Sequence, residues 1–528
     1  MLNRRDYLRA GILSGSLALA GKPSQGRAQS GSRAQLGINL SGPADWNSEL
    51  PFVDLFRMSR PWVSQSNGAP FGGGPPLNLN QYGWVNRLDP GAWAETLLCT
   101  DLLGHSPRGI HQVYYRGNGL LAFSNSAQLI DSSPGHCRIN VDPLKGNAIS
   151  LQIRQTDPKN PIRDIHVIAP GFEKTWQYAP FHPTFLARWK GFACLRFMDW
   201  MLTNGSDVKT WADRPTVNDA TTSARGVPLE TMIALCNQLR INPWFCMPHL
   251  ADDNYVQQFA HLVRRTLSPS LKIYLEYSNE LWNGSFPQSK YVGDQGVALG
   301  FGTADKPWEA GWRYTAYRSV QIFKIWENVF GGTGRLVRVL GSQSVNPYIS
   351  DQILSFQNAW KNADALAIAP YLGFNVGQGD YATIANDIAG GDVNHLLDVF
   401  DSSAFPLAVQ SMQKSKVVAD KYGLKMVAYE SGQHMLASTG DATLDGRISD
   451  LMNAANRHPR MGDIYKRYYD AWSAAGGDMM GVFASVAKWS IHGYWGLGEW
   501  YDQHASAIPK YEQTLQWAKQ AGQNVSVD

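Results

Sequence analysis

Strand-like and helix-like runs alternate along much of the chain, and this alternation restricts the possible folds more than any other feature. Seven apolar runs of strand type occupy residues 191–200, 242–250, 272–280, 335–344, 363–372, 425–432 and 479–489. Stretches with helical spacing lie at 228–240, 254–267, 308–329, 405–422 and 463–475. Strands that alternate with helices indicate a parallel α/β sheet.

An eighth strand upstream would complete a closed barrel. The segments "LGINL" at 36–40 and "PFVDLFRMSRPW" at 51–62 are the candidates. Eight strands alternating with helices predict a (β/α)8 barrel, whose active site lies at the carboxyl ends of the strands. A doubly wound sheet is the alternative. No glycine-rich dinucleotide fingerprint opens a helix after a strand, and "FGGGPP" at 71–76 has the composition of a loop.

Residues 77–170 have a different character. Short β-type runs at 109–124, 136–141 and 148–156 are separated by Gly, Asn, Pro and Ser. This pattern predicts a small antiparallel β domain inserted between the barrel segments 36–76 and 171–520. Such a domain either binds carbohydrate or acts as a lid or prop on the barrel.

The N-terminus has the features of an export signal. Arg4 and Arg5 precede an apolar stretch at 12–20, which is followed by small and polar residues. We expect residues 1–29 to be a signal peptide of the twin-arginine type, or an ordinary one, and the protein to be periplasmic or secreted. The net charge of +3, with no long run of either sign, gives no electrostatic case for nucleic acid or an anionic membrane as a partner.

Five cysteines in 528 residues do not form a disulfide framework. Cys194 and Cys246 lie in strand-like runs and Cys236 in a helical one, so we expect three buried thiols. Whether Cys99 and Cys137 form a bridge is left open. Because no pair has zinc-ligand spacing, we expect no metal, and no cofactor motif is present.

Polar residues end most of the predicted barrel strands. Strand ends of a barrel converge on one mouth, so such side chains share a site. In chain order the positions are Arg196, with Asp199 just beyond it, then His249, Asn279 with Glu280, Tyr371, Glu430, and Lys488 with Trp489.

Glu280 and Glu430 end the fourth and seventh strands and would face each other across the mouth. Two carboxyl groups in one mouth are typical of glycoside hydrolysis, in which one protonates the leaving oxygen and the other attacks or activates water. We expect partial burial and nearby negative charge to keep Glu280 protonated. We expect Arg196 and the Tyr371 hydroxyl to keep Glu430 ionised.

The sequences around both glutamates resemble those of clan A retaining glycoside hydrolases. "EYSNE" is similar to the E-x-x-N-E pattern at the end of strand four, and "YESG" to the E-x-G pattern at strand seven. The resemblance implies that Glu280 is the acid/base, that Glu430 is the nucleophile, and that Asn279 binds the sugar 2-hydroxyl. It departs after Glu280, where many relatives have Pro and this chain has Leu281.

The same resemblance implies further carbohydrate contacts. Arg196 in "LRF" and Tyr371 in "APY" match positions beside the nucleophile, and His249 matches a frequent histidine of strand three. Trp489 matches the strand-eight tryptophan that forms the floor of the sugar subsite. On the loops, Trp282 and Trp495 are either sugar platforms or packing residues.

Other interpretations compete with these. Glu276 is expected to be a structural carboxylate inside the barrel, paired with Arg196, and Asp252 with Asp253 a helix N-cap rather than a metal site. A transglycosylase would use the same residues as a hydrolase. A non-catalytic carbohydrate-binding barrel would not need both glutamates, and an exported oxidoreductase would need a cofactor motif.

Overall fold

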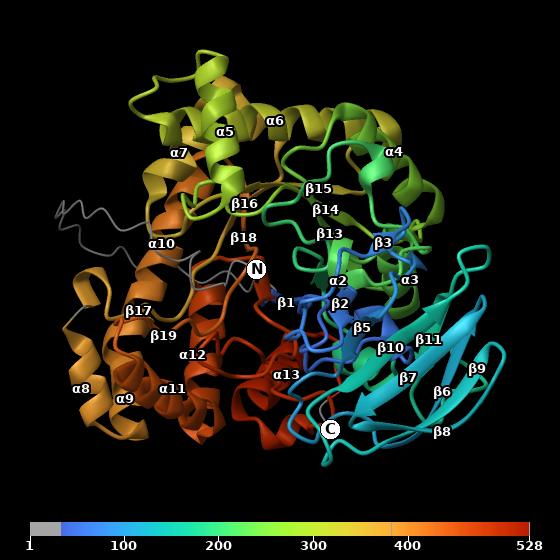
Figure 1. Ribbon diagram of the computed structural model, residues 1–528. Coiled ribbons are helices and arrows are strands. Elements are labelled where there is room, and N and C mark those ends of the chain that lie inside the picture. Colours follow the sequence, from blue (N-terminus) through green and yellow to red (C-terminus); the bar gives the residue numbers. More distant parts are fainter. Residues whose placement is uncertain (1–32, 382, 527–528) are drawn as a thin grey trace.

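The computed structural model describes residues 33–526 with the exception of residue 382, and its centre is a closed barrel of eight parallel strands (Figure 1). The predicted signal peptide lies outside the described residues. In order around the barrel the strands are β1 (Gln35–Asn39), β12 (Cys194–Arg196), β13 (Asn242–Met247), β14 (Ile273–Tyr277), β15 (Leu336–Gly341), β16 (Ala365–Ile368), β18 (Lys425–Ala428) and β20 (Met479–Val482). The predicted (β/α)8 barrel is confirmed, and its first strand is the 36–40 candidate.

Helices surround the barrel and bury its outer face. Their bounds are α1 (Pro183–Trp189), α3 (Leu229–Leu239), α4 (Asp253–Thr266), α6 (Pro307–Phe330), α7 (Pro347–Ser355), α10 (Phe405–Lys421), α12 (Pro459–Ala474) and α13 (Pro509–Gln520). Two more helices lie farther out: α2 (Thr222–Arg225) contacts the helical turn at Leu55–Met58, and α5 (Pro287–Ala298) packs on α6. Strands covered on both faces are apolar throughout, and every residue of β16 and β20 is buried. The Asp252 carboxylate accepts a hydrogen bond from the Tyr255 amide, which confirms it as the N-cap of α4.

The barrel interior makes room for one carboxylate. A Cβ atom at Gly341 would lie 3.0 Å from Oε1 of Glu276. Glycine at this position of β15 therefore leaves space for the Glu276 side chain, which projects from the neighbouring strand β14. Tryptophan, cysteine, alanine and valine side chains fill much of the remaining interior.

Two antiparallel sheets follow the first barrel strand. One has the order β2 (Val63–Ser66), β5 (Ala92–Leu98), β10 (Ile149–Thr156), β7 (Gly119–Asn125), and the other the order β11 (Arg163–Ile168), β6 (Gly109–Arg116), β9 (His136–Val141), β8 (Ala127–Ser133). A short hairpin, β3 (Asn78–Leu79) with β4 (Val85–Arg87), accompanies them.

Side chains of both sheets meet in a second apolar core. Alternate residues of β5 are buried, as expected for strands with one face on a core. The predicted inserted β unit is confirmed as a fold feature. Because β2 pairs with β5, the antiparallel structure begins before residue 77. The division of the chain into domains at 77 and 170 stays a prediction.

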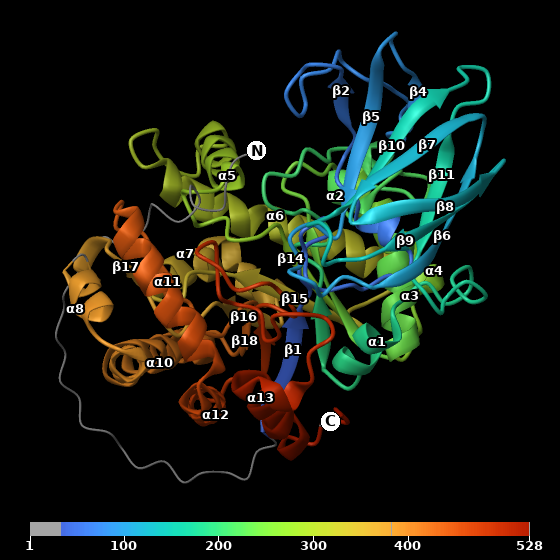
Figure 2. The same ribbon diagram turned by 60° about the horizontal axis from the view of Figure 1, so that its bottom comes forward.

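The antiparallel unit lies beside the end of the barrel toward which β1 points (Figure 2). Trp500, from the loop after β20, is buried in the core of this unit and stacks on His105 with a centroid distance of 4.4 Å. The Lys488 ammonium donates a hydrogen bond to the Asp101 carbonyl. The unit is therefore held against the loop that follows the eighth strand.

A helical layer occupies another side of the barrel, at the lower left of Figure 1. It consists of α8 (Ile384–Gly390), α9 (Val393–Val399) and α11 (Ala442–Arg457). The short strands β17 (Asn375–Val376) and β19 (Leu436–Ala437) pair with each other and join the loops that follow the sixth and seventh barrel strands. None of the helices in the described part of the chain is long and apolar enough to cross a membrane.

The second candidate for the first strand and the expected end of the eighth strand differ from the structure. The run at 51–62 contains a short helical turn at Leu55–Met58 and no barrel strand. The run at 479–489 is strand only as far as Val482. The apolar pattern continues because the loop beyond is itself buried, from Phe483 to Val486.

Candidate active site

Arg196, the last residue of β12, binds four side chains at the mouth of the barrel. Its Nε and one terminal nitrogen donate to Oε2 of Glu276 at 3.1 and 2.9 Å, and its other terminal nitrogen donates to Oε1 of Glu430 at 2.9 Å. The side-chain oxygens of Asn39 and Asn279 accept the remaining two bonds. A guanidinium has five N–H groups, so each has an acceptor and the group is fixed in place.

Glu276 supports this arrangement from inside the barrel. It is 2% exposed, and its Oε2 also accepts a hydrogen bond from Nε1 of Trp244 at 2.8 Å. The ion pair with Arg196 confirms the structural role that we expected. One guanidinium thus lies between a buried structural carboxylate and the carboxylate of Glu430.

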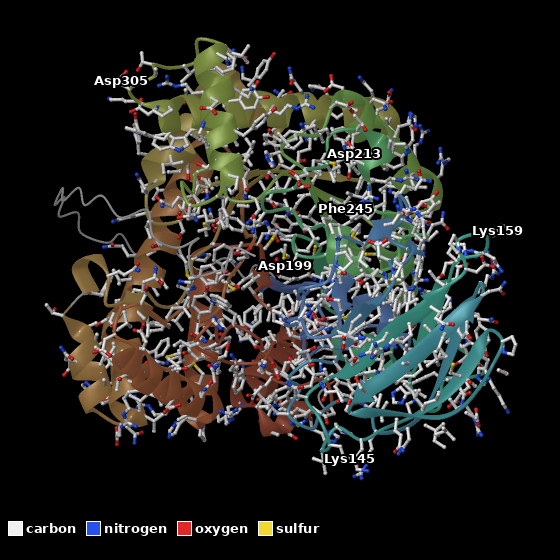
Figure 3. The ribbon with its side chains drawn as sticks, viewed as in Figure 1. Lys145, Lys159, Asp199, Asp213, Phe245 and Asp305 are labelled. Carbon is white, nitrogen blue, oxygen red and sulfur yellow. The ribbon has the colours of Figure 1, made fainter. Side chains whose placement is uncertain are left out.

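Glu430 follows the seventh barrel strand and is 5% exposed. Its Oε1 accepts from Arg196, and its Oε2 accepts from the Tyr371 hydroxyl at 2.8 Å. Burial raises the pKa of Glu430, while Arg196 and Tyr371 act in the opposite direction. Asp199, which lies near the centre of the barrel in the view of Figure 3, also raises this pKa.

Glu280 lies on an irregular segment beyond β14. The φ angles of Ser278 and Glu280 are +57° and +44°, in a region that non-glycine residues rarely occupy. The partly buried carboxyl group of Glu280 accepts from the Tyr429 hydroxyl at 3.0 Å and from Nδ2 of Asn283 at 2.9 Å. Burial, and then the charge of Glu430, raise the pKa of Glu280 to about 7.

The two glutamates therefore have different partners. Glu430 is bound by a cation, which favours its ionised form, whereas the partners of Glu280 among the described residues are a phenol and an amide. When two carboxyl groups influence each other, the proton stays on the one without the cation. This arrangement separates a proton donor from a nucleophile, as two-carboxylate catalysis needs.

Asn279 is oriented by a chain of amides. Its Oδ1 accepts from Arg196, so its Nδ2 points to Oδ1 of Asn204 at 3.0 Å. Nε2 of Gln288 donates to the same Asn204 oxygen and to the Asn279 carbonyl. Asn204 and Gln288 belong to no motif in the sequence and were not predicted.

Trp495 and His434 extend the site beside Tyr371. Trp495 donates from Nε1 to Nδ1 of His434 at 3.0 Å, and the His434 ring lies 5.1 Å from that of Tyr371. Trp495 is partly exposed and also contacts Phe483. It is thus close to the residue that binds Glu430. His434 was missed, although it lies only four residues after Glu430.

Trp489 does not lie where the sequence placed it. It is 4% exposed, its Nε1 donates to the Gly496 carbonyl, and the Lys510 ammonium lies 4.6 Å from the ring centroid. Arg457 approaches the same ring at 5.0 Å. Because β20 ends at Val482, Trp489 is a core residue, and this placement does not fit a sugar floor.

His249 and Trp282 are not joined to the network of glutamates by any hydrogen bond in residues 33–526. His249 is 6% exposed and packs edge-on against Tyr291, and burial lowers its pKa to about 4. Its Nδ1 and the Nε1 of Trp282 are buried without a hydrogen-bond partner among the described residues. Their predicted sugar contacts stay predictions.

All five cysteines are free and buried, so Cys99 and Cys137 are not bridged. The three thiols expected in the barrel are confirmed. Within the described ranges, no group of three or more His, Cys, Asp or Glu side chains is arranged to hold a metal ion.

Comparison with known proteins gives only distant structural matches. No family model and no curated protein matches the sequence. Similar solved structures include a 4-O-α-L-rhamnosyl-β-D-glucuronidase from Fusarium oxysporum (12% identity, TM-score 0.35, covering 61% of this chain and 60% of that one) and an endo-β-1,4-mannanase from Cellulomonas fimi (10%, 0.30, 56% and 58%). A GH10 endoxylanase from a sugarcane soil metagenome matches at 9% identity and a TM-score of 0.35, covering 63% of this chain and 90% of that one.

This chain covers less than two thirds of the length of each of the first two structures. The neighbours are glycoside hydrolases. At these identities and TM-scores, we draw no conclusion about this chain's activity from them.

Proposed function

We propose that this chain is a retaining glycoside hydrolase that cleaves a β-linked polysaccharide or oligosaccharide by double displacement. Glu430 is the nucleophile and Glu280 the acid/base. The observation that carries the proposal is the unequal pair of buried carboxyl groups at the ends of the fourth and seventh barrel strands. One is bound to Arg196, and the other has a pKa raised to about 7 by burial and by its partner's charge.

In the first step a carboxylate oxygen of Glu430 attacks the anomeric carbon. The glycosidic bond breaks, and its oxygen takes the proton of Glu280 and leaves as an alcohol. Arg196 and Tyr371 hold both oxygens of the nucleophile before the attack. A covalent glycosyl ester on Glu430 results, with Glu280 now ionised.

In the second step Glu280 acts as a base. Esterification removes the charge of Glu430, which is the largest cause after burial of the raised pKa of Glu280. Glu280 thus becomes more acidic, and its carboxylate takes a proton from the water that attacks the ester. A sugar hydroxyl in place of water would make the enzyme a transglycosylase.

We also propose that the protein is exported to the periplasm or secreted, with residues 1–29 as the signal. This agrees with a polymeric substrate, because such polymers lie outside the cell. Cells that express the full chain test this proposal. Protein that stays inside these cells with an uncleaved N-terminus would contradict export.

A panel assay tests the activity. Wild type is incubated with β-glucan, β-mannan, xylan and a bacterial exopolysaccharide, and products are separated by size. Glu430→Gln should release nothing, whereas Glu280→Gln should be slowest on bonds with poor leaving groups, which most need the proton. Glu327→Gln is a matched control, since Glu327 pairs with Arg338 outside the mouth.

Each outcome of the panel has a distinct meaning. Full activity in Glu430→Gln would refute its assignment. Products longer than the substrate would indicate transglycosylation. Retardation on a polymer gel without any product, equal in wild type and Glu430→Gln, would indicate a carbohydrate-binding barrel instead of an enzyme.

A further inference from the structure

Tyr429, the residue before Glu430, reaches across the barrel mouth to the other glutamate. It is 1% exposed and follows directly on β18, with its ring among the side chains of the barrel interior. Its hydroxyl donates to Oε1 of Glu280 at 3.0 Å. The guanidinium carbon of Arg196 lies 5.1 Å from the centroid of its ring. One side chain thus contacts both Glu280 and the guanidinium that binds Glu430.

We propose that Tyr429 is the positioning residue of Glu280, holding its carboxyl group in place and linking it to the ion pair of Arg196 with Glu430. This inference rests on the proposed function. Glu280 needs such support because it lies beyond the end of β14, on a segment that no strand pairing fixes. With Asn283 on Oε2 and Tyr429 on Oε1, both carboxyl oxygens have a donor, and rotation of the group would break both bonds.

The hydrogen bond from Tyr429 also affects the pKa of Glu280. The charged and titratable groups that face Glu280 are Glu430, Arg196, Tyr371 and Tyr429. Burial and Glu430 favour the protonated form, whereas Arg196 and the donated hydroxyl hydrogen of Tyr429 favour the ionised form. Without that hydroxyl the pKa of Glu280 should rise further.

Tyr429→Phe isolates the hydroxyl. The variant keeps the ring that packs in the barrel and faces Arg196, so only one hydrogen bond is lost. Tyr469→Phe is a matched control, because Tyr469 is also fully buried and its hydroxyl pairs with Thr514 between α12 and α13. The control should leave the carboxylates and the basal activity unchanged.

The first readout needs no substrate. Protein labelled with ¹³C at the glutamate carboxyl carbons is titrated by NMR, and the Glu280 signal is identified by its absence from Glu280→Gln. We expect the midpoint of Glu280 to rise by about one pH unit in Tyr429→Phe, the scale of one lost hydrogen bond to a charged group. It should not move in Tyr469→Phe. An unmoved midpoint in Tyr429→Phe would overturn the inference.

The second readout is the pH dependence of kcat/KM on the polymer that the panel identifies. Because Glu280 must be protonated in the first step, the alkaline limb should move upward with its midpoint. A uniform loss of activity without displacement of the limb would mean a structural role only, and would refute the inference while the function stands. A shifted NMR midpoint in a protein that cleaves none of the polymers would support the contact and count against the proposed function.

Discussion

Replacing Glu280 with glutamine should stabilise the protein at alkaline pH while it impairs turnover. The folded protein raises the pKa of Glu280 to about 7 from an ordinary value of 4.5. Between these two values the folded state binds a proton that the unfolded state releases. The stability that this proton contributes is fully present below pH 4.5 and is lost as the pH rises through 7.

The magnitude follows from the two pKa values. At 1.36 kcal/mol for each pH unit, ionising Glu280 inside the folded protein costs about 3 kcal/mol. Glutamine has a similar shape and never ionises, so Glu280→Gln avoids this penalty. We expect the free energy of unfolding of the variant to exceed that of wild type by about 3 kcal/mol at pH 8. At pH 4.5 the two free energies should be nearly equal.

Urea unfolding of both proteins at a series of pH values measures this difference. Glu49 is a useful comparison, because burial also raises its pKa to about 7 and its partners are Trp189 and Ser485, outside the carboxylate pair. Glu49→Gln should show the same pH trend in stability without the catalytic defect. A difference between Glu280→Gln and wild type that is constant with pH, or larger in acid, would refute the reasoning.

Three further substitutions test other parts of the site. Tyr371→Phe should raise the pKa of Glu430 and move the acidic limb of kcat/KM upward by about one pH unit, since the nucleophile must be ionised; an unmoved limb would contradict this. Arg196→Met leaves two buried carboxylates without a cation and should lower the free energy of unfolding by about 3–5 kcal/mol in urea; a loss below 1 kcal/mol would count against the network. Trp495→Ala should raise KM for the polymer with little effect on the free energy of unfolding. Trp489→Ala should lower the free energy of unfolding by about 3–5 kcal/mol. A raised KM in Trp489→Ala with unchanged stability, and lost stability in Trp495→Ala, would instead support Trp489 as the sugar floor.

The barrel was predictable because its strands are buried on both faces. Such strands form continuous apolar runs in the sequence. Seven of the eight were identified directly, and the first was one of two candidates, 36–40 and 51–62. Their ends were less predictable. The run at 479–489 continued past Val482 into a buried loop, which placed Trp489 at the mouth when it belongs to the core.

The centre of the site was also predictable, because the carboxyl ends of barrel strands converge on one mouth. Hydrogen bonds join Arg196 to Asn279 and Glu430, and Tyr371 to Glu430. Glu280 is linked to this group through Tyr429 and through the charge of Glu430. Each of these residues lies at a strand end or within three residues of one, so the barrel topology brings them to the same mouth.

Positions that depend on loop conformation were missed. Tyr429 was not predicted, although it directly precedes Glu430. Its contact with Glu280 depends on the positive φ angles of the segment after β14, which the sequence does not reveal. Asn204 and Gln288 meet only because the loop after β12 and the start of α5 approach each other. No periodicity in the sequence encodes such an approach.

The central claim, that Glu430 forms a covalent glycosyl ester, can be tested by trapping the intermediate. Wild type is incubated with activated 2-deoxy-2-fluoro β-glycosides of glucose, mannose and xylose, which slow the release of the ester, and is then digested and analysed by mass spectrometry. We predict a single fluorosugar on the peptide that contains Glu430, and none on that peptide in Glu430→Gln. A fluorosugar attached to Glu280 or to another residue, with Glu430 unmodified, would contradict the account.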